Sequence, residues 1–173
     1  MSAGYSGTPL VKKLGIKAGA KLYINGAPPH YFDLLGSLPE DVRISPRLSG
    51  EFDFIHIFAQ QRARLTAQLA KVIPHLQPDG MVWISWPKGT SKLETDLNGG
   101  LVRELGQAAG LVDIKVCAVD DDWSGHKFVI PVADRPKSKS KSKTAKRKTA
   151  KSKQPKPPGK KKSKTAKRTA RKK

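Results

Sequence analysis

Lysine is the residue type best placed to do chemistry in this sequence, because it is concentrated in one segment. Residues 136–173 contain 16 Lys and 3 Arg and no Asp or Glu. Each basic side chain that neutralises a phosphate on DNA releases a condensed counterion, so such a run binds a phosphate backbone. The segment has no aromatic side chain to stack on unpaired bases and no predicted element to read base edges. The sequence therefore predicts sequence-nonspecific binding to nucleic acid, with DNA favoured over RNA.

The candidate nucleic-acid-binding residues are all the basic side chains of this segment. They are Lys137, Lys139, Lys141, Lys143, Lys146, Arg147, Lys148, Lys151, Lys153, Lys156, Lys160, Lys161, Lys162, Lys164, Lys167, Arg168, Arg171, Lys172 and Lys173. Electrostatics alone does not select among polyanions, so acidic membranes and polyphosphate remain alternative partners. A tail that only improves solubility is the remaining interpretation.

The rest of the chain is almost neutral. The whole sequence has a net charge of +20, but residues 1–135 hold 15 basic and 14 acidic side chains. Beyond residue 135 there is no Leu, Ile, Val, Met or aromatic residue, so that part cannot bury enough apolar surface to offset its conformational entropy. We predict an α/β globular domain over residues 1–135 and a disordered Lys/Ser/Thr/Ala-rich tail over residues 136–173.

Several classes of protein are disfavoured. A lone Cys117 excludes an internal disulfide framework and a Cys-based zinc site, and we expect it to be a small buried hydrophobe. No apolar stretch is long enough to span a bilayer, and the first residues lack a secretory signal pattern. We expect a cytoplasmic, nucleoid-associated protein with no metal site and no cofactor.

The first half of the body predicts strands followed by one helix. The segments 21–24 and 42–44 have the composition of short strands, and residues 52–58 are rich in aromatic and β-branched side chains. In residues 61–73 the apolar positions recur at helical spacing. Residues 78–80, Pro-Asp-Gly, predict a turn.

The second half predicts a buried strand, a helix and a hairpin. The strand covers residues 81–86, and the helix covers residues 101–109 and ends at Gly110. Residues 111–119 and 127–132 predict two antiparallel strands, with residues 120–126 as their connector. The order of elements predicts a small three-layer, Rossmann-like sandwich with a mostly parallel sheet and a terminal antiparallel hairpin.

A candidate ligand cleft lies where predicted strands end, because open α/β sheets bind ligands outside the carboxyl ends of their strands. Its residues are Asn25, Gly26, Trp86, Lys88 and Lys92. Lys88, Lys92 and nearby backbone N–H groups could hold an anion, although Pro-Lys-Gly is also ordinary loop chemistry.

No catalytic residue is predicted. His56 alternates with Phe54 and Phe58 on one strand face, which favours a hydrogen-bonded core histidine over a catalytic base. Ser124 lies in Trp-Ser-Gly-His, which is not a nucleophile elbow. Asp120 and its two acidic neighbours lack the spacing of a calcium loop, and we expect a solvated hairpin tip.

Two segments carry a family resemblance. Residues 52–57, Phe-Asp-Phe-Ile-His-Ile, and residues 76–84, Leu-Gln-Pro-Asp-Gly-Met-Val-Trp-Ile, flank a predicted helix. In this order they resemble the second half of class I methyltransferases, in which such strands lie beside the cofactor cleft and the last two strands form an antiparallel edge. The resemblance implies that fold for about residues 52–132.

The chain departs from methyltransferases where S-adenosylmethionine would bind. Their first strand is followed by a Gly-rich turn, whereas here the turn includes Pro28 and Pro29, which have no backbone N–H. No acidic residue ends the second strand to hold ribose hydroxyls. Only about eight residues separate Ile44 from Phe52, which leaves no room for the usual further strand and helix.

A second resemblance covers residues 2–135. It is carried by residues 2–10, 12–17, 86–88, 110–113 and 123–125. These are similar to a bacterial family of unknown function, domain-of-unknown-function family number 3052, which implies a bacterial cytosolic protein but assigns no activity. The tail is similar, in composition and short repeats only, to bacterial histone-H1-like proteins.

Two functions remain open. The first is a histone-like, nucleoid-associated protein, in which the α/β body serves as a partner, ligand or dimerisation module. The alternative is an S-adenosylmethionine-dependent, methyltransferase-like enzyme that the tail tethers to nucleic acid. The missing Gly-rich turn favours the first, non-enzymatic function.

Overall fold

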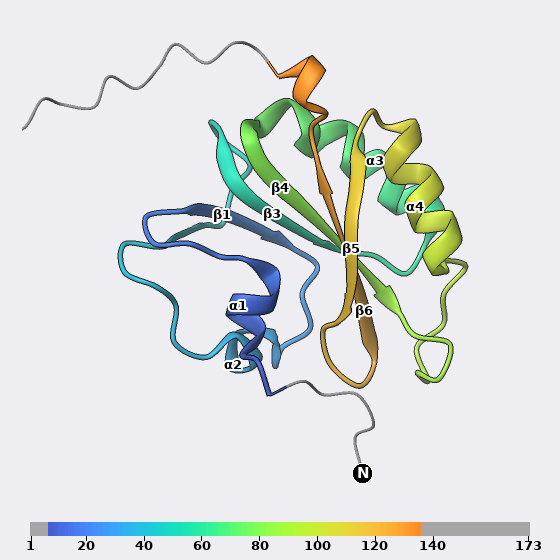
Figure 1. Cartoon of the computed structure of the whole chain (residues 1–173). Helices are drawn as coiled ribbons and strands as arrows, with labels where there is room; N and C mark the ends of the chain where they lie inside the picture. The colour runs from blue at the N-terminus through green and yellow to red at the C-terminus, as the bar shows by residue number, and fades with distance from the viewer. Residues whose placement is uncertain (1–6, 136–173) are drawn as a thin grey trace, which may run out of the picture. The chain divides into compact units, whose positions relative to one another are not determined.

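The computed structural model describes residues 7–135. Their core is one six-stranded sheet in the order β2-β1-β3-β4-β6-β5 (Figure 1). The strands are β1 (Lys21–Asn25), β2 (Arg43–Ser45), β3 (Phe52–Phe58), β4 (Leu76–Pro87), β5 (Val112–Ala118) and β6 (Trp123–Val129). The first four strands pair in parallel, and β6 is antiparallel to both β4 and β5. The predicted mostly parallel sheet with a terminal hairpin is confirmed.

Helices cover both faces of the sheet and make three layers (Figure 1). One face packs against α3 (Arg62–Val72) and α4 (Gly99–Ala108). The other packs against two five-residue helices, α1 (Leu10–Leu14) and α2 (Tyr31–Leu35). Two 3-10 turns complete the described chain, η1 (Ile73–His75) and η2 (Val132–Asp134).

The elements with the clearest sequence patterns form as predicted. In β3 six of the seven residues are buried, because both faces of this central strand are covered by helices. In α3 the buried residues are Leu65, Leu69 and Val72, which recur on one face. Helix α4 begins at a cap in which Asn98 Oδ1 accepts from Leu101 N at 2.9 Å, and Gly110 follows its end with φ +84°.

Two local predictions were wrong. Residues 78–80 do not form a turn that precedes a strand, because β4 runs without a break from Leu76 and absorbs these residues as an irregularity opposite β3. A Cβ at Gly80 would lie 3.0 Å from Phe52 O, so glycine permits that close approach. The connector of the hairpin is also shorter than expected, since β6 begins at Trp123, and residues 123–126 belong to the strand.

The segment between β2 and β3 is short, as predicted. Residues 46–51 link the two strands directly and form no further strand or helix. Helices α1 and α2 escaped prediction, because five residues are too few to show a helical period. Within residues 7–135, no helix has the length and apolar character needed to cross a membrane.

Candidate functional site

A cavity of about 440 Å³ lies at the carboxyl ends of β1 and β3. The turn after β1 supplies Gly26 and Pro28, the end of β3 supplies Phe58, and the start of β6 supplies Trp123. This is the position at which open parallel sheets bind ligands, and the volume is that of a small-molecule site. Its other lining residues are His30, Gln60, Gln61, Arg64, Leu93 and Asp122.

Glycine at position 26 brings the β1 turn against β3. Gly26 has φ +71°, a conformation that L side chains rarely adopt, and a Cβ there would lie 2.8 Å from Phe58 O. The close approach of two backbones fixes one wall of the cavity. Gly26 is therefore a structural requirement of the site.

Asp120 fixes the part of the hairpin that supplies Asp122 and Trp123 to the cavity. Its Oδ1 accepts from the backbone N–H groups of Asp122 at 2.8 Å and Trp123 at 2.7 Å, and its Oδ2 lies 2.8 Å from His30 Nε2. Asp120 is 8% exposed, so the prediction of a solvated tip was wrong for this residue. The carboxylate orders the hairpin and joins it to the residue that precedes α2.

The N-terminus of α3 also borders the cavity, and its first backbone N–H already has a partner within the chain. Asp96 Oδ1 accepts from Arg62 N at 2.7 Å, and Thr95 Oγ1 donates to Gln60 O at 2.7 Å. The carboxylate compensates the positive end of the helix. Arg64, from the first turn of α3, contributes hydrogen-bond donors to the lining of the cavity, whereas His30 already bonds Asp120 through Nε2.

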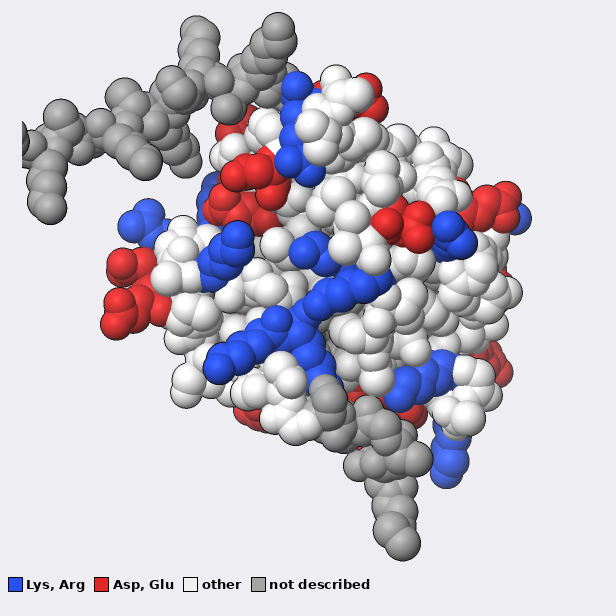
Figure 2. Space-filling view, viewed as in Figure 1, with Lys and Arg blue, Asp and Glu red and all other residues white. Residues whose placement is uncertain are grey.

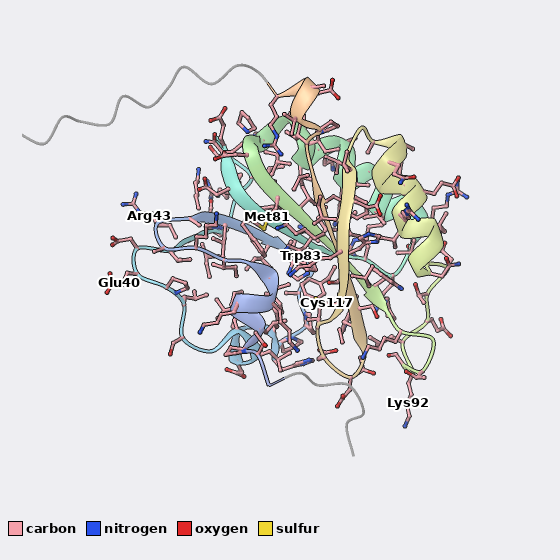
Figure 3. All side chains as sticks on the ribbon, viewed as in Figure 1. Glu40, Arg43, Met81, Trp83, Lys92 and Cys117 are labelled. Carbon is pink, nitrogen blue, oxygen red and sulfur yellow. The ribbon has the colours of Figure 1, made fainter. Side chains whose placement is uncertain are left out.

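The five residues predicted for the cleft are not brought together. Gly26 lines the cavity, and Lys88 reaches its neighbourhood, where Nζ donates to Asp120 O at 2.6 Å and the backbone N donates to Asp122 O at 2.7 Å. Asn25 instead bonds Tyr23 and Gln68 under α3, and Trp86 is buried in the core on the α3–α4 face. Lys92 is exposed and points away from the body (Figure 3). A ligand role for these five residues stays a prediction.

Several residues of the cavity were missed by the sequence prediction. Gln60 and Gln61 directly follow β3, and Trp123 opens β6, so their positions at strand ends were an available signal. His30 carried no such signal, because its partner Asp120 is 90 residues away in the sequence.

His56 belongs to a buried chain of hydrogen bonds and not to the cavity. Its Nδ1 lies 2.7 Å from Tyr31 Oη, its Nε2 lies 2.7 Å from Ser85 Oγ, and its side chain is completely buried. Burial lowers the pKa of His56 to about 3 and raises the pKa of Tyr31, so both are neutral at pH 7. The prediction of a hydrogen-bonded core histidine is confirmed.

Cys117 is partly buried on the α1 side of the sheet, where it packs against the core cluster that contains Trp83 (Figure 3). Burial raises the pKa of its thiol, although Lys115 and Lys13 act in the opposite direction. The thiolate is the reactive form of cysteine, so we expect the protonated thiol of Cys117 to be a poor nucleophile at neutral pH. The described residues contain no cluster of three His, Cys, Asp or Glu side chains that could hold a metal ion.

Part of the chain matches a known protein family. Residues 53–132 match the model of a family described as a protein of unknown function, DUF3052. The expected resemblance is confirmed for residues 53–132, whereas the match does not extend to residues 2–52, which were also expected to resemble the family. No curated protein sequence matches the chain significantly.

The region that contains the DUF3052 match has the fold of methyltransferases. A possible exported protein from Bordetella parapertussis has a TM-score of 0.52 at 12% identity, over 70% of this chain and 66% of that chain. Magnesium protoporphyrin IX methyltransferase from Synechocystis PCC 6803 with bound SAH has a TM-score of 0.50 at 8% identity, over 70% and 78%. The DhpI–SAH complex has a TM-score of 0.50 at 12% identity, over 69% and 81%. At these identities the likeness establishes a Rossmann-like, methyltransferase-like fold and nothing more.

The residues of this chain do not fit S-adenosylmethionine in the manner of that fold. The turn after β1 has one glycine, and Pro28 and Pro29 offer no N–H to a ligand. β2 ends at Ser45, whose Oγ donates to Arg47 O, so no carboxylate stands there to accept ribose hydroxyls. The basic residues predicted to bind nucleic acid, 137–173, lie outside the described residues.

Proposed function

We propose that the protein binds nucleic acid without sequence specificity, DNA in particular, through the basic residues of segment 136–173. The observation that carries this proposal is the segregation of charge: 19 basic side chains and no acid in that segment, against a near-neutral body. Fully extended, the segment reaches about 120 Å, which is roughly 35 base pairs of duplex. The proposal includes a histone-like role in the nucleoid of the cytoplasm.

The deciding experiment is fluorescence anisotropy on labelled duplex DNA over a salt series, with the full chain and with residues 1–135. If about ten charges engage phosphates, the slope of log K against log salt is near −9 for the full chain. Removal of the segment abolishes tight binding. Equal affinity of the two proteins would contradict a role for the segment.

The α/β body acts in this proposal as a partner, ligand or dimerisation module. Support for a homodimer comes from β5, an edge strand with exposed Val112, Ile114 and Val116, of which Val116 is 58% exposed. Exposed apolar edge strands pair readily with a second chain. Light scattering is expected to show a dimer that Ile114→Lys converts to a monomer. A wild-type monomer at high concentration would remove dimerisation from the proposal.

The alternative is a methyltransferase-like enzyme that uses S-adenosylmethionine. The cavity beside Gly26 and Phe58 supports it, because it lies at the edge of the sheet where this fold binds ligands. Pro28, Pro29 and the end of β2 oppose it. Calorimetry of the full chain with S-adenosylmethionine is expected to show no binding heat. Micromolar binding would overturn the non-enzymatic proposal.

A further inference from the structure

Basic side chains gather on the α1 side of the sheet, where β5 and β6 form its edge. Lys115 and Lys127 are register partners on these two strands, and Lys115 Nζ donates to Lys13 O at 2.8 Å. Lys17 follows α1 and lies near enough to act on Lys127 electrostatically. Basic side chains form a band across the middle of this face, over α1 and β5 (Figure 2). We name Lys17, Lys115 and Lys127 the α1–β5 basic patch.

The charges of this patch are not balanced by ion pairs. In the part of the chain that the structure describes, the ion pairs join His30 to Asp120 and join Arg103 and His126 to Asp113. None of them includes Lys17, Lys115 or Lys127. Asp53 and Asp79 border Lys17 in a small cavity, but neither forms an ion pair with it, and one oxygen of Asp53 accepts from Lys21 N at 2.8 Å.

The ammonium group of Lys115 is held in place. The contact of Lys115 with Lys13 O fixes one end of its side chain, and its Nζ lies 5.7 Å from the ring centroid of buried Trp83. Lys127 is partly buried, and burial, followed by Lys115 and Lys17, lowers its pKa. A group of cations that form no ion pairs attracts polyanions to this surface.

We propose that the α1–β5 basic patch is a second nucleic-acid contact, on the body itself, which binds the phosphodiester backbone. Trp83 beneath the patch is fully buried, so no aromatic ring there stacks on bases, and the contact is with phosphates. The patch and the segment 136–173 carry the same sign of charge, so both attract the same polyanion. This inference rests on the proposed function for the identity of the partner, although it concerns a different site.

The test uses the full chain and a matched pair of triple variants. The patch variant carries Lys17→Gln, Lys115→Gln and Lys127→Gln, and the control carries Arg43→Gln, Arg47→Gln and Lys71→Gln at exposed positions elsewhere. Both lose the same charge. Loss of three phosphate contacts makes the slope of log K against log salt shallower by about 2.7 in the patch variant, with a much smaller change in the control. Equal slopes in the two variants would contradict the proposal that the patch binds the DNA backbone.

A third variant separates this inference from the proposed function. In a full chain whose basic residues in 136–173 are all replaced by Gln, the patch retains weak DNA binding with a slope near −3. Wild-type affinity in that variant would refute the role of the segment but not the patch, and complete loss of binding would refute the patch.

Anionic phosphatidylserine vesicles provide the last comparison. A patch variant that loses vesicle binding and keeps its DNA slope assigns the patch to membranes and overturns the proposal.

Discussion

On one face of the sheet, α3 and α4, with 11 and 10 residues, pack aliphatic side chains such as Leu65 and Val102 against the strands. On the other face, α1 and α2 have five residues each, and the core contains Tyr31, Phe58 and Trp83 together with the hydrogen bonds of His56. Long helices bury a continuous apolar stripe. Short helices cannot, so aromatic edge contacts and buried hydrogen bonds hold that face together.

This comparison predicts different responses to substitution on the two faces. The α1–α2 face depends on partners that must all be present, because an unpaired buried polar group costs more than its hydrogen bond contributed. The α3–α4 face depends on the volume of each side chain.

The largest expected effect is on the polar chain. His56→Leu leaves the hydroxyls of Tyr31 and Ser85 buried without a partner and lowers the free energy of unfolding by about 4 kcal/mol. Urea denaturation measures it. The triple variant Tyr31→Phe, His56→Leu, Ser85→Ala removes all three polar groups and recovers a large part of the loss. If His56→Leu were as stable as the wild type, the α1–α2 face would not depend on its buried hydrogen bonds, and the contrast between the two faces would be wrong.

The next effect tests packing on the α3–α4 face. A Cβ at Gly106 in α4 would lie 2.3 Å from the ring of fully buried Phe128, so Gly106→Ala lowers the free energy of unfolding by about 2 kcal/mol despite its better helix propensity. Gly106→Ala combined with Phe128→Leu restores stability. Gly100→Ala is the matched control in the same helix, where the nearest atom is Asn98 Oδ1 at 3.3 Å. Equal losses at positions 100 and 106 would argue against a packing effect.

A smaller effect is the pH dependence of the polar chain. The pKa of His56 is about 3 in the folded protein and ordinary in the unfolded chain, so the unfolded state binds a proton first as the pH falls. Stability is complete above about pH 6.5 and decreases by about 1 kcal/mol between pH 6.5 and 5.5. Burial also lowers the pKa of His126, which adds to the decrease. Thermal melts over this range measure the slope, and the triple variant without His56 gives a shallower one.

The smallest effect is expected where the α1–α2 face reaches solvent. His30 is about half exposed, so its contact with Asp120 is screened by water, and His30→Ala costs about 0.5 kcal/mol. Asp120→Ala costs more, because it also removes the acceptor of the Asp122 and Trp123 N–H groups. Chemical denaturation of the two variants compares their losses of unfolding free energy. A larger loss for His30→Ala than for Asp120→Ala would show that His30 has the main stabilising role.

The difference between the two faces also explains which elements could be predicted from the sequence and which could not. The residues of β3 and the periodic leucines of α3 define the α3–α4 face within short stretches of chain, and both were predicted. The α1–α2 face depends on pairs distant in sequence, such as Trp83 Nε1, which donates to Leu14 O at 2.9 Å, and no local pattern indicates them. The cavity follows the same rule, since Gly26 and Phe58 meet only after β1 and β3 have paired.

The three tryptophans of the chain occupy three different environments, so their intrinsic fluorescence reports on three parts of the protein. Trp83 lies under Lys115 of the basic patch, Trp123 lines the cavity beside Phe58, and Trp86 is packed on the α3–α4 face. Single-tryptophan variants therefore give separate fluorescence signals for these three sites. A ligand in the cavity changes the emission of Trp123, whereas an anion on the patch changes the emission of Trp83. Trp86 reports only the loss of the fold.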